Sequence, residues 1–179
     1  MSNIYAHTKL GGIHLIGHPQ NILRIKQKLK KRNHRLNKPT SRDALKKIET
    51  EYGITLPDEL VMFYTEISNG CTMIDGFELL CIENWKIDSK KIKCEFPFSE
   101  CWLWEVETEP DKDLLQAIHC GNISLIDIGC GQTWRIVIKG GEKGNMWFFT
   151  DVGIQPCSPK QNFLSWLEFW LDGNEDYFS

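Results

Sequence analysis

The feature that most limits the fold of this chain is a series of three short apolar segments in its C-terminal third, separated by glycine-rich turns. The segments are 124–128, 134–139 and 146–149, and the second is rich in β-branched residues, which favour strands. The turns at 129–131 and 140–145 hold five of the 14 glycines. Because glycine reaches a positive φ without a Cβ clash, such turns reverse the chain tightly. The pattern therefore predicts an antiparallel meander.

Two helices are expected before this meander. Thr40 and Asp43 have the spacing of a capping box, and Gly53 is placed to end the first helix. Pro57 is preset for the first turn of the second helix, which Asn69-Gly70 ends. The faces that we expect to be buried are Ala44, Leu45, Ile48 and Tyr52 in the first helix, and Leu60, Phe63, Tyr64 and Ile67 in the second.

The first forty residues predict a hairpin followed by a basic helix. Apolar segments 4–10 and 13–16 flank Gly11-Gly12, a pair suited to a two-residue turn. From Pro19 to Leu36 the residues Ile22, Ile25 and Leu29 repeat at helical spacing among seven Lys and Arg residues, which indicates a basic amphipathic helix. Asn37-Lys38-Pro39 ends it, because the residue before a proline avoids helical geometry.

The remaining segments complete an α+β pattern. We expect strands at 77–82 and 85–87, an acidic loop at 105–113, and either a short helix or a connection at 114–120. The closing helix at 162–171 carries Phe163, Trp166, Leu167 and Trp170 on one face. The fold predicted is a predominantly antiparallel sheet flanked by helices, with an N-terminal hairpin and basic helix.

Charge divides the chain unevenly. Residues 1–40 contain nine Lys and Arg and no Asp or Glu, whereas the other 139 residues contain 12 basic and 24 acidic residues, a net charge of −12. Such asymmetry concerns partners more than fold. We expect two parts: residues 1–40, a basic N-terminal hairpin and helix extension, and residues 41–179, the main domain.

The cysteine content and the hydropathy of the sequence indicate the cellular compartment in which the protein works. The seven cysteines are odd in number and include no CxxC pair, so neither a disulfide framework nor a zinc site is expected. We expect most of them to be small buried side chains in a reducing environment. The sequence has no apolar stretch long enough to span a membrane, and no apolar run of signal-peptide length follows Met1, so we expect a cytoplasmic protein.

The search for catalytic and cofactor-binding motifs yields none that is complete. Trp134 stands where a dinucleotide fingerprint needs its third glycine, and 140–145 lacks the Gly-Lys-Ser/Thr of a phosphate loop. His14 and His18 are four apart, but Leu15 occupies the position of a zincin glutamate and the local pattern is strand-like. His119-Cys120 are only sequence neighbours, a weak basis for a nucleophile and base. We therefore expect no catalytic residue, no metal and no cofactor.

Seven tryptophans give a different signal. Trp134, Trp147, Trp166 and Trp170 fall in regular elements, where core packing is expected. Trp102 and Trp104 lie beside the acidic loop, and in a strand they would point the same way. The pair would then form an aromatic ledge next to carboxylates, which suits a protein interface, although core packing is as good an interpretation.

The order of these motifs resembles the SUKH superfamily. The resemblance rests on Leu56-Pro57-x-x-Leu60-x-x-Phe63-Tyr64 closing on Asn69-Gly70, and on Ile126-Asp127-Ile128-Gly129-Cys130-Gly131 running through Gly140 and Gly144 to Met146-Trp147. The last helix, with Phe163, Trp166 and Leu167, fits the same scheme, so the resemblance covers residues 42–172. It implies a compact α+β fold, a binding role and no shared catalytic residues. The basic N-terminal forty residues depart from the common pattern.

The resemblance implies two kinds of partner. Many family members resemble immunity proteins that block a cognate toxin, often a nuclease, in bacterial competition. Others, in the Smi/Knr branch, resemble intracellular regulatory scaffolds. For a toxin encoded by a neighbouring gene, the expected contact residues are Trp102, Trp104, Glu105, Glu107, Glu109, Asp111 and Asp113.

The basic helix offers a third possibility, nucleic-acid binding. The residues that would contact phosphates are Arg24, Lys28, Lys31, Arg32 and Arg35. The favoured alternative is that the helix docks on the acidic body through Ile22, Ile25 and Leu29, with its charges partly neutralised there.

Overall fold

A five-stranded antiparallel sheet forms the centre of the protein. The computed structural model describes residues 14–73 and 76–179. The strands lie in the order β3-β7-β6-β5-β4, and every neighbouring pair is antiparallel. Their bounds are β3 (Trp102–Leu103), β4 (Asn122–Gly129), β5 (Gln132–Val137), β6 (Met146–Phe149) and β7 (Gly153–Pro156). The predicted meander is confirmed as β4, β5 and β6, and β7 and β3 extend it at one edge.

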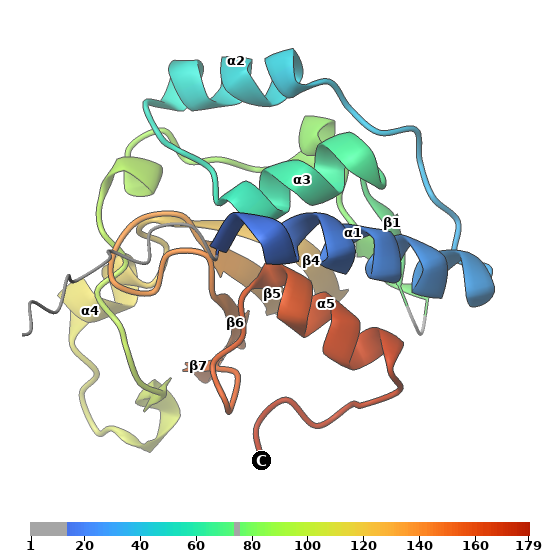
Figure 1. Ribbon diagram of the computed structural model, residues 1–179. Coiled ribbons are helices and arrows are strands. Elements are labelled where there is room, and N and C mark those ends of the chain that lie inside the picture. The colour runs from blue at the N-terminus through green and yellow to red at the C-terminus, as the bar shows by residue number, and fades with distance from the viewer. Residues whose placement is uncertain (1–13, 74–75) are drawn as a thin grey trace, which may run out of the picture.

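Three helices lie together on one side of this sheet. They are α1 (His14–Lys31), α3 (Asp58–Glu66) and α5 (Phe163–Leu171), and each contacts the other two (Figure 1). Helix α2 (Arg42–Tyr52) lies outside α3, and the short α4 (Lys112–Ala117) directly precedes β4 in the chain. The predicted α+β architecture, an antiparallel sheet flanked by helices, is confirmed.

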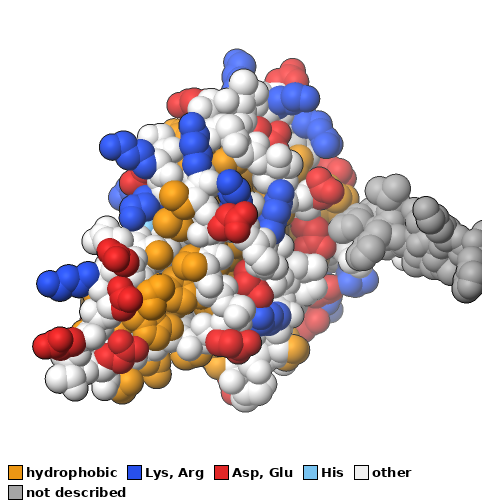
Figure 2. All heavy atoms as spheres, turned by 90° about the vertical axis from the view of Figure 1, so that its left-hand side faces the viewer, with side chains coloured by type: hydrophobic (Ala, Val, Ile, Leu, Met, Phe, Trp, Pro, Cys, Tyr) orange, Lys and Arg blue, Asp and Glu red, His pale blue; other side chains and the backbone are white. Residues whose placement is uncertain are grey.

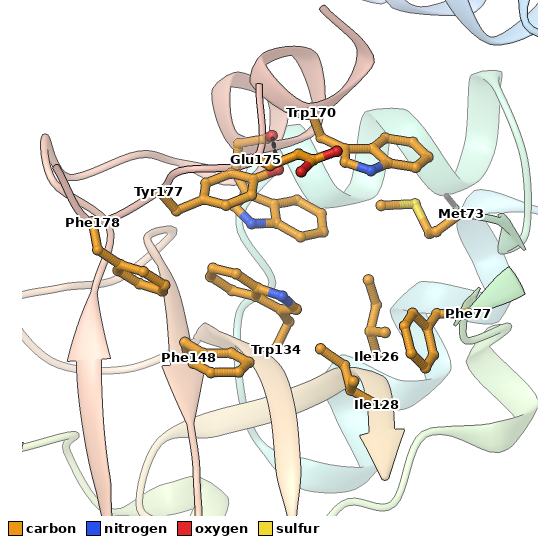
Figure 3. Close-up of a pocket in the computed structure, with 11 residues that line it drawn as sticks. Met73, Phe77, Ile126, Ile128, Trp134, Phe148, Trp170, Glu175, Tyr177 and Phe178 are labelled. Carbon is orange, nitrogen blue, oxygen red and sulfur yellow. Dashed lines mark hydrogen bonds between the residues drawn. The ribbon is translucent and has the colours of Figure 1, made fainter. Parts of the chain in front are cut away.

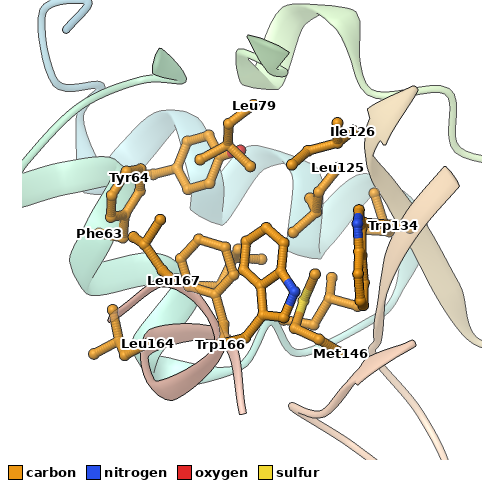
Figure 4. Packing of buried hydrophobic residues seen from close by; sticks show 14 of the residues in the cluster. Phe63, Tyr64, Leu79, Leu125, Ile126, Trp134, Met146, Leu164, Trp166 and Leu167 are labelled. Carbon is orange, nitrogen blue, oxygen red and sulfur yellow. The ribbon is translucent and has the colours of Figure 1, made fainter. Parts of the chain in front are cut away.

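Hydrophobic packing covers both faces of the central strands. On β5, Trp134 and Ile136 face the helices and belong to the main core, while Val137 belongs to a smaller cluster on the opposite face. Met146 and Trp147 divide in the same way on β6. Figure 4 shows how Trp166 and Leu167 of α5, Phe63 and Tyr64 of α3 and Trp134 of β5 meet in the main core. Alternate residues of a strand point to opposite faces, so β5 and β6 each contribute side chains to both clusters.

The ends of the predicted helices differ from the structure. Ser41, and not Thr40, caps α2 by accepting a hydrogen bond from the Ala44 backbone N–H at 3.1 Å. Gly53, at φ 64°, ends α2 as predicted. Pro57 is the N-cap residue of α3, one position before the helix. The helix ends at Glu66, three residues before the Asn69-Gly70 pair.

The basic helix is confirmed as part of α1, but the predicted N-terminal hairpin is wrong where the structure can test it. Residues 14–16 belong to α1 and not to a strand, while 4–13 lie outside the described residues. The helix also ends at Lys31, and Leu36 forms an isolated bridge with Cys71. The backbone of Leu36 therefore takes a β partner that no local pattern indicates.

Two predicted strands in the middle of the chain are also corrected. Of 77–82 only β2 (Glu78–Leu79) is a strand, paired with β1 (Cys71–Thr72), because Ile82 opens the 3₁₀ turn η2 (Ile82–Asn84). Residues 85–87 form no strand, although Trp85 is buried in the core. The ambiguous segment 114–120 is in part helical, since α4 runs to Ala117.

The cysteines are all free, but fewer are buried than expected. Three of the seven are buried, and Cys94, Cys101 and Cys130 are exposed. Burial raises the pKa of both the Cys71 and Cys157 thiols to about 12, which keeps these two protonated at neutral pH.

Candidate partner-binding surface

The edge strand β3 and the turn after it position Trp102 and Trp104. Trp102 pairs with Ile154 of β7, and the 3₁₀ turn η4 (Trp104–Val106) begins directly after Leu103. The strand therefore does not continue through Trp104, as a ledge of parallel side chains would require. The two rings nevertheless contact each other, with centroids 5.2 Å apart at 60°.

Both indoles are fixed by contacts on several sides. Trp102 stacks on Phe98 with centroids 5.4 Å apart and 13° between planes. Its Nε1–H donates to Glu107 Oε1 at 2.6 Å, and the Trp104 Nε1–H donates to the Asp151 carbonyl at 2.9 Å. Both rings pack on the smaller core cluster and are partly exposed. Each ring is partly buried and partly exposed, and contacts within the protein already determine its orientation in the absence of a partner.

Three exposed apolar side chains lie in the same segment of the chain as these rings. Leu103, Val106 and Leu114 are 46%, 79% and 39% exposed. They are three of the five large hydrophobic residues found exposed in the described part of the chain. Such a concentration of exposed apolar groups is typical of interaction sites.

Carboxylates surround this apolar group. Glu105, Glu107, Glu109, Asp111 and Asp113 are all exposed, and Lys112 is the single basic residue within 102–114. Asp111 also caps α4 by accepting from the Asp113 and Leu114 backbone N–H groups at 2.8 and 3.2 Å. On the side of the molecule that carries α4, Figure 2 shows hydrophobic side chains gathered among Asp and Glu. We call residues 102–114 the acidic surface.

The basic helix α1 is docked on the body of the protein. Ile22, Ile25 and Leu29 are buried in the main core, at 4%, 0% and 0% exposure. The docked arrangement that we favoured over an exposed helix is confirmed at these three positions. The burial joins α1 to the same core as α3 and α5.

Part of the charge on α1 is paired with α5. Arg24 and Lys28 both bind the Glu168 carboxylate, and Lys28 also binds Asp172 at 2.5 Å. The hydrogen bond from Arg24 is the main reason that the pKa of Glu168 falls to about 2. Beyond the helix, Arg35 pairs with Glu78 at 2.6 Å, while Lys31 and Arg32 are exposed. Three of the five candidate phosphate contacts thus already hold carboxylates.

An apolar cavity of about 250 Å³ lies on the helix side of the sheet, where the residues after α5 cross it. Figure 3 shows the rings of Trp134 and Trp170 on opposite sides of it, with Ile126, Ile128 and Phe77 along another wall. The expected core role of Trp134, Trp147, Trp166 and Trp170 is confirmed, since all are 8% exposed or less. The cavity itself was missed, because the sequence does not reveal that Tyr177 and Phe178 return to Trp134.

Other kinds of site were tested against the described residues. No group of three or more His, Cys, Asp or Glu in residues 20–73 and 76–179, whose side chains the structure describes, could hold a metal ion. None of the helices in that part of the chain combines the length and apolarity needed to cross a membrane. His119 is exposed, and its neighbour Cys120 is buried with a raised thiol pKa caused first by desolvation.

The comparisons with known proteins agree with this geometry at the level of the family. The sequence profile of the SMI1 / KNR4 family (SUKH-1) matches residues 39–171. No curated protein and no solved structure gives a significant match. The matched segment includes α2, α3, α5 and all five strands of the central sheet. The chain belongs to the SMI1 / KNR4 family (SUKH-1).

Proposed function

We propose that this chain is a non-enzymatic binding protein, an immunity protein that uses the acidic surface to bind and neutralise a nuclease-type toxin. Domains of this family are protein-interaction domains. The observation that carries the proposal is the combination of exposed Leu103 and Val106 with five exposed carboxylates in the same segment.

The chemistry of a nuclease explains why this combination suits it as a partner. An enzyme that holds a phosphate backbone needs a surface rich in Lys and Arg. Carboxylates on the inhibitor steer the encounter and determine orientation, while buried apolar and aromatic groups supply most of the affinity. Occupying the basic surface would exclude the nucleic acid. The inhibitor would act in the cytoplasm, where its free thiols stay reduced.

Co-expression with the protein encoded by the neighbouring gene tests the proposal. A stable one-to-one complex that suppresses a nuclease activity of the partner supports it. A neighbouring product that neither binds nor harms cells when expressed alone would refute the toxin assignment.

A regulatory scaffold of the same superfamily is the alternative within the family. It would use the same acidic surface on several cellular proteins. Affinity capture from the native cytoplasm separates the two, since a scaffold would retain several partners of moderate affinity and an immunity protein one tight partner.

Nucleic-acid binding through α1 remains a second proposal, and the exposure of Lys31 and Arg32 favours it. The pairing of Arg24, Lys28 and Arg35 with carboxylates reduces the positive field available to phosphates. A salt titration of DNA and RNA retardation decides the matter, because binding of this kind weakens steeply with ionic strength. Absence of retardation at low salt would exclude it.

A further inference from the structure

A polar cavity of about 310 Å³ lies on the face of β5 opposite the main core. The residues that matter in its lining are Lys86, Asp88, Lys91, His119, Asn122 and Arg135. Three of these six are permanent cations, although the chain from residue 41 onward is acidic. The cavity is separate from both the acidic surface and the aromatic cavity, since it shares no lining residue with either.

Arg135 is the central residue of this cavity. It follows Trp134 on β5 and therefore points to the opposite face, where its guanidinium lies 4.8 Å from the centre of the Phe149 ring. Its Nε donates to Thr133 Oγ1 and its Nη1 donates to Asn122 Oδ1, both at 3.0 Å. No hydrogen bond within the described chain uses Nη2.

The guanidinium has no carboxylate partner among the residues that the structure describes. Desolvation by burial lowers its pKa, and the nearby negative charge of Asp127 opposes this. A desolvated cation without a counter-ion is costly, and arginine is also the side chain best suited to bind a planar or tetrahedral oxyanion through two donors. The cavity thus contains a largely desolvated guanidinium that forms no direct ion pair with a described carboxylate, and an open donor on that group.

The other charged groups leave the cavity with a net positive charge. The Asp88 carboxylate accepts from the backbone N–H groups of Lys90 and Lys91 at 2.8 and 3.0 Å, which ties it to the turn. Lys91 Nζ donates to the Gln116 carbonyl at 2.9 Å, and Lys86 is exposed at the rim. One carboxylate therefore stands against three cations.

We propose that this cavity binds the oxyanion group, phosphate or carboxylate, of a small ligand, with Arg135 as the principal donor and Lys86 and Lys91 as supporting cations. The volume suits a single anionic group or a small metabolite, since it lies at the lower end of the range for ligand pockets, about 300 to 1,000 Å³.

His119 supplies a reporter for occupancy. Arg135 Nη1 lies 3.5 Å from His119 Nδ1, and a guanidinium can only donate, so Nδ1 is the acceptor. Desolvation, followed by the charges of Arg135 and Lys91, lowers the pKa of His119, while Asp88 opposes this. A bound anion would offset the two cations and raise that pKa. By linkage, protonation of His119 would strengthen anion binding.

NMR titration of the whole chain with inorganic phosphate, sulfate and acetate tests the inference. The expected result is saturable shifts at Arg135, His119 and Lys91 with at least one of these anions, and a raised His119 pKa in its presence. Sulfate keeps its charge between pH 5 and 8, so its binding should tighten as His119 becomes protonated. Saturation with phosphate and sulfate alone identifies a phosphate site, and saturation with acetate alone a carboxylate site. Shifts that stay linear with all three anions, or spread over every surface lysine, would overturn the proposal.

Variants separate this site from general surface charge. Arg135→Met places an apolar side chain beside the Phe149 ring in place of the guanidinium and should weaken anion binding by about tenfold or more, because charge-assisted hydrogen bonds are lost. Arg135→Lys keeps the charge and should bind with intermediate affinity. Lys86→Gln should also weaken binding, whereas Lys90→Gln, an exposed neighbour outside the lining, should not. If Arg135→Met does not fold, Lys86→Gln and Lys90→Gln still test the site. Equal anion affinities of these two variants would refute it.

Discussion

The Trp102 indole N–H donates a hydrogen bond to the Glu107 carboxylate at 2.6 Å. Glu107 lies five positions after Trp102, and the bond closes the turn that carries Glu105 and Val106. The aromatic and acidic parts of the acidic surface are therefore one structural unit. An interface that needs both would find them already in position, which reduces the cost of ordering on binding.

The variant Glu107→Ala tests, in the protein alone, whether this hydrogen bond fixes the Trp102 indole. The bond is exposed, so we expect a loss of stability below about 1 kcal/mol. Hydrogen exchange at the Trp102 indole, measured by NMR, should accelerate, while the Trp104 indole, bonded to the Asp151 carbonyl, should stay unchanged. Equal exchange of Trp102 in both proteins would contradict the described contact.

Docking of α1 predicts a contrast between two leucines on the same helix. Leu29 is fully buried and Leu23 is 58% exposed. Leu29→Ala should destabilise the protein by about 3 kcal/mol through lost burial and a cavity, whereas Leu23→Ala should cost less than about 0.5 kcal/mol. Urea unfolding of the two variants checks this, and similar effects would mean that α1 is detached in solution.

The ion pairs of Glu168 predict a specific pH dependence. The folded-state pKa is lowered from 4.5 to about 2, so the contribution is present above pH 4.5 and is lost as pH falls towards 2. Because Arg24 and Lys28 are partly exposed, water screens the interaction, and we expect about 1 kcal/mol. Wild type should exceed Glu168→Gln in stability at pH 6 and equal it near pH 2. A difference that does not change with pH would show that the carboxylate charge is not involved.

Gly121 lies next to Asn122 of the polar cavity, and a side chain at this position would collide with the backbone. Its φ is +59°, and an added Cβ would lie 2.7 Å from the Lys139 carbonyl oxygen and 2.8 Å from that of Cys94. Gly121→Ala should cost about 3 kcal/mol or more, since neither backbone can yield without breaking hydrogen bonds. Gly141→Ala, where no atom lies within 4 Å of the added Cβ, should be nearly neutral in thermal unfolding. If both variants unfold at the wild-type temperature, the close approach is absent.

Local patterns predicted those parts of the fold whose signals are local. The meander was found because its turns need glycines and its strands need β-branched residues. Strands β3 and β7 were missed because they are two and four residues long, and β7 contains both Gly153 and Pro156. Their pairing is determined by tertiary contacts. The start of α1 was missed because Gly17 and Pro19 oppose a helix that packing supports further along.

The composition of the candidate surface could be predicted from the sequence, but its geometry could not. The carboxylates of 105–113 can be read directly from the sequence, and so can Trp102 and Trp104. The stacking of Phe98 on Trp102 and the exposure of Val106 depend on the path of the chain. Arg135 gave no signal at all, because a single arginine in a strand looks like an exposed residue until the opposite face is seen to be covered.

The central claim, that the acidic surface binds a basic partner, is tested most directly by its affinity for the protein encoded by the neighbouring gene. The double variant Glu105→Gln/Glu109→Gln removes two of its charges, and Asp43→Asn/Glu51→Gln removes two exposed charges from α2 as a matched control. The account predicts that the first variant binds about tenfold or more weakly, with a smaller salt dependence, and that the control binds like wild type. Equal affinity of both variants and wild type would contradict it.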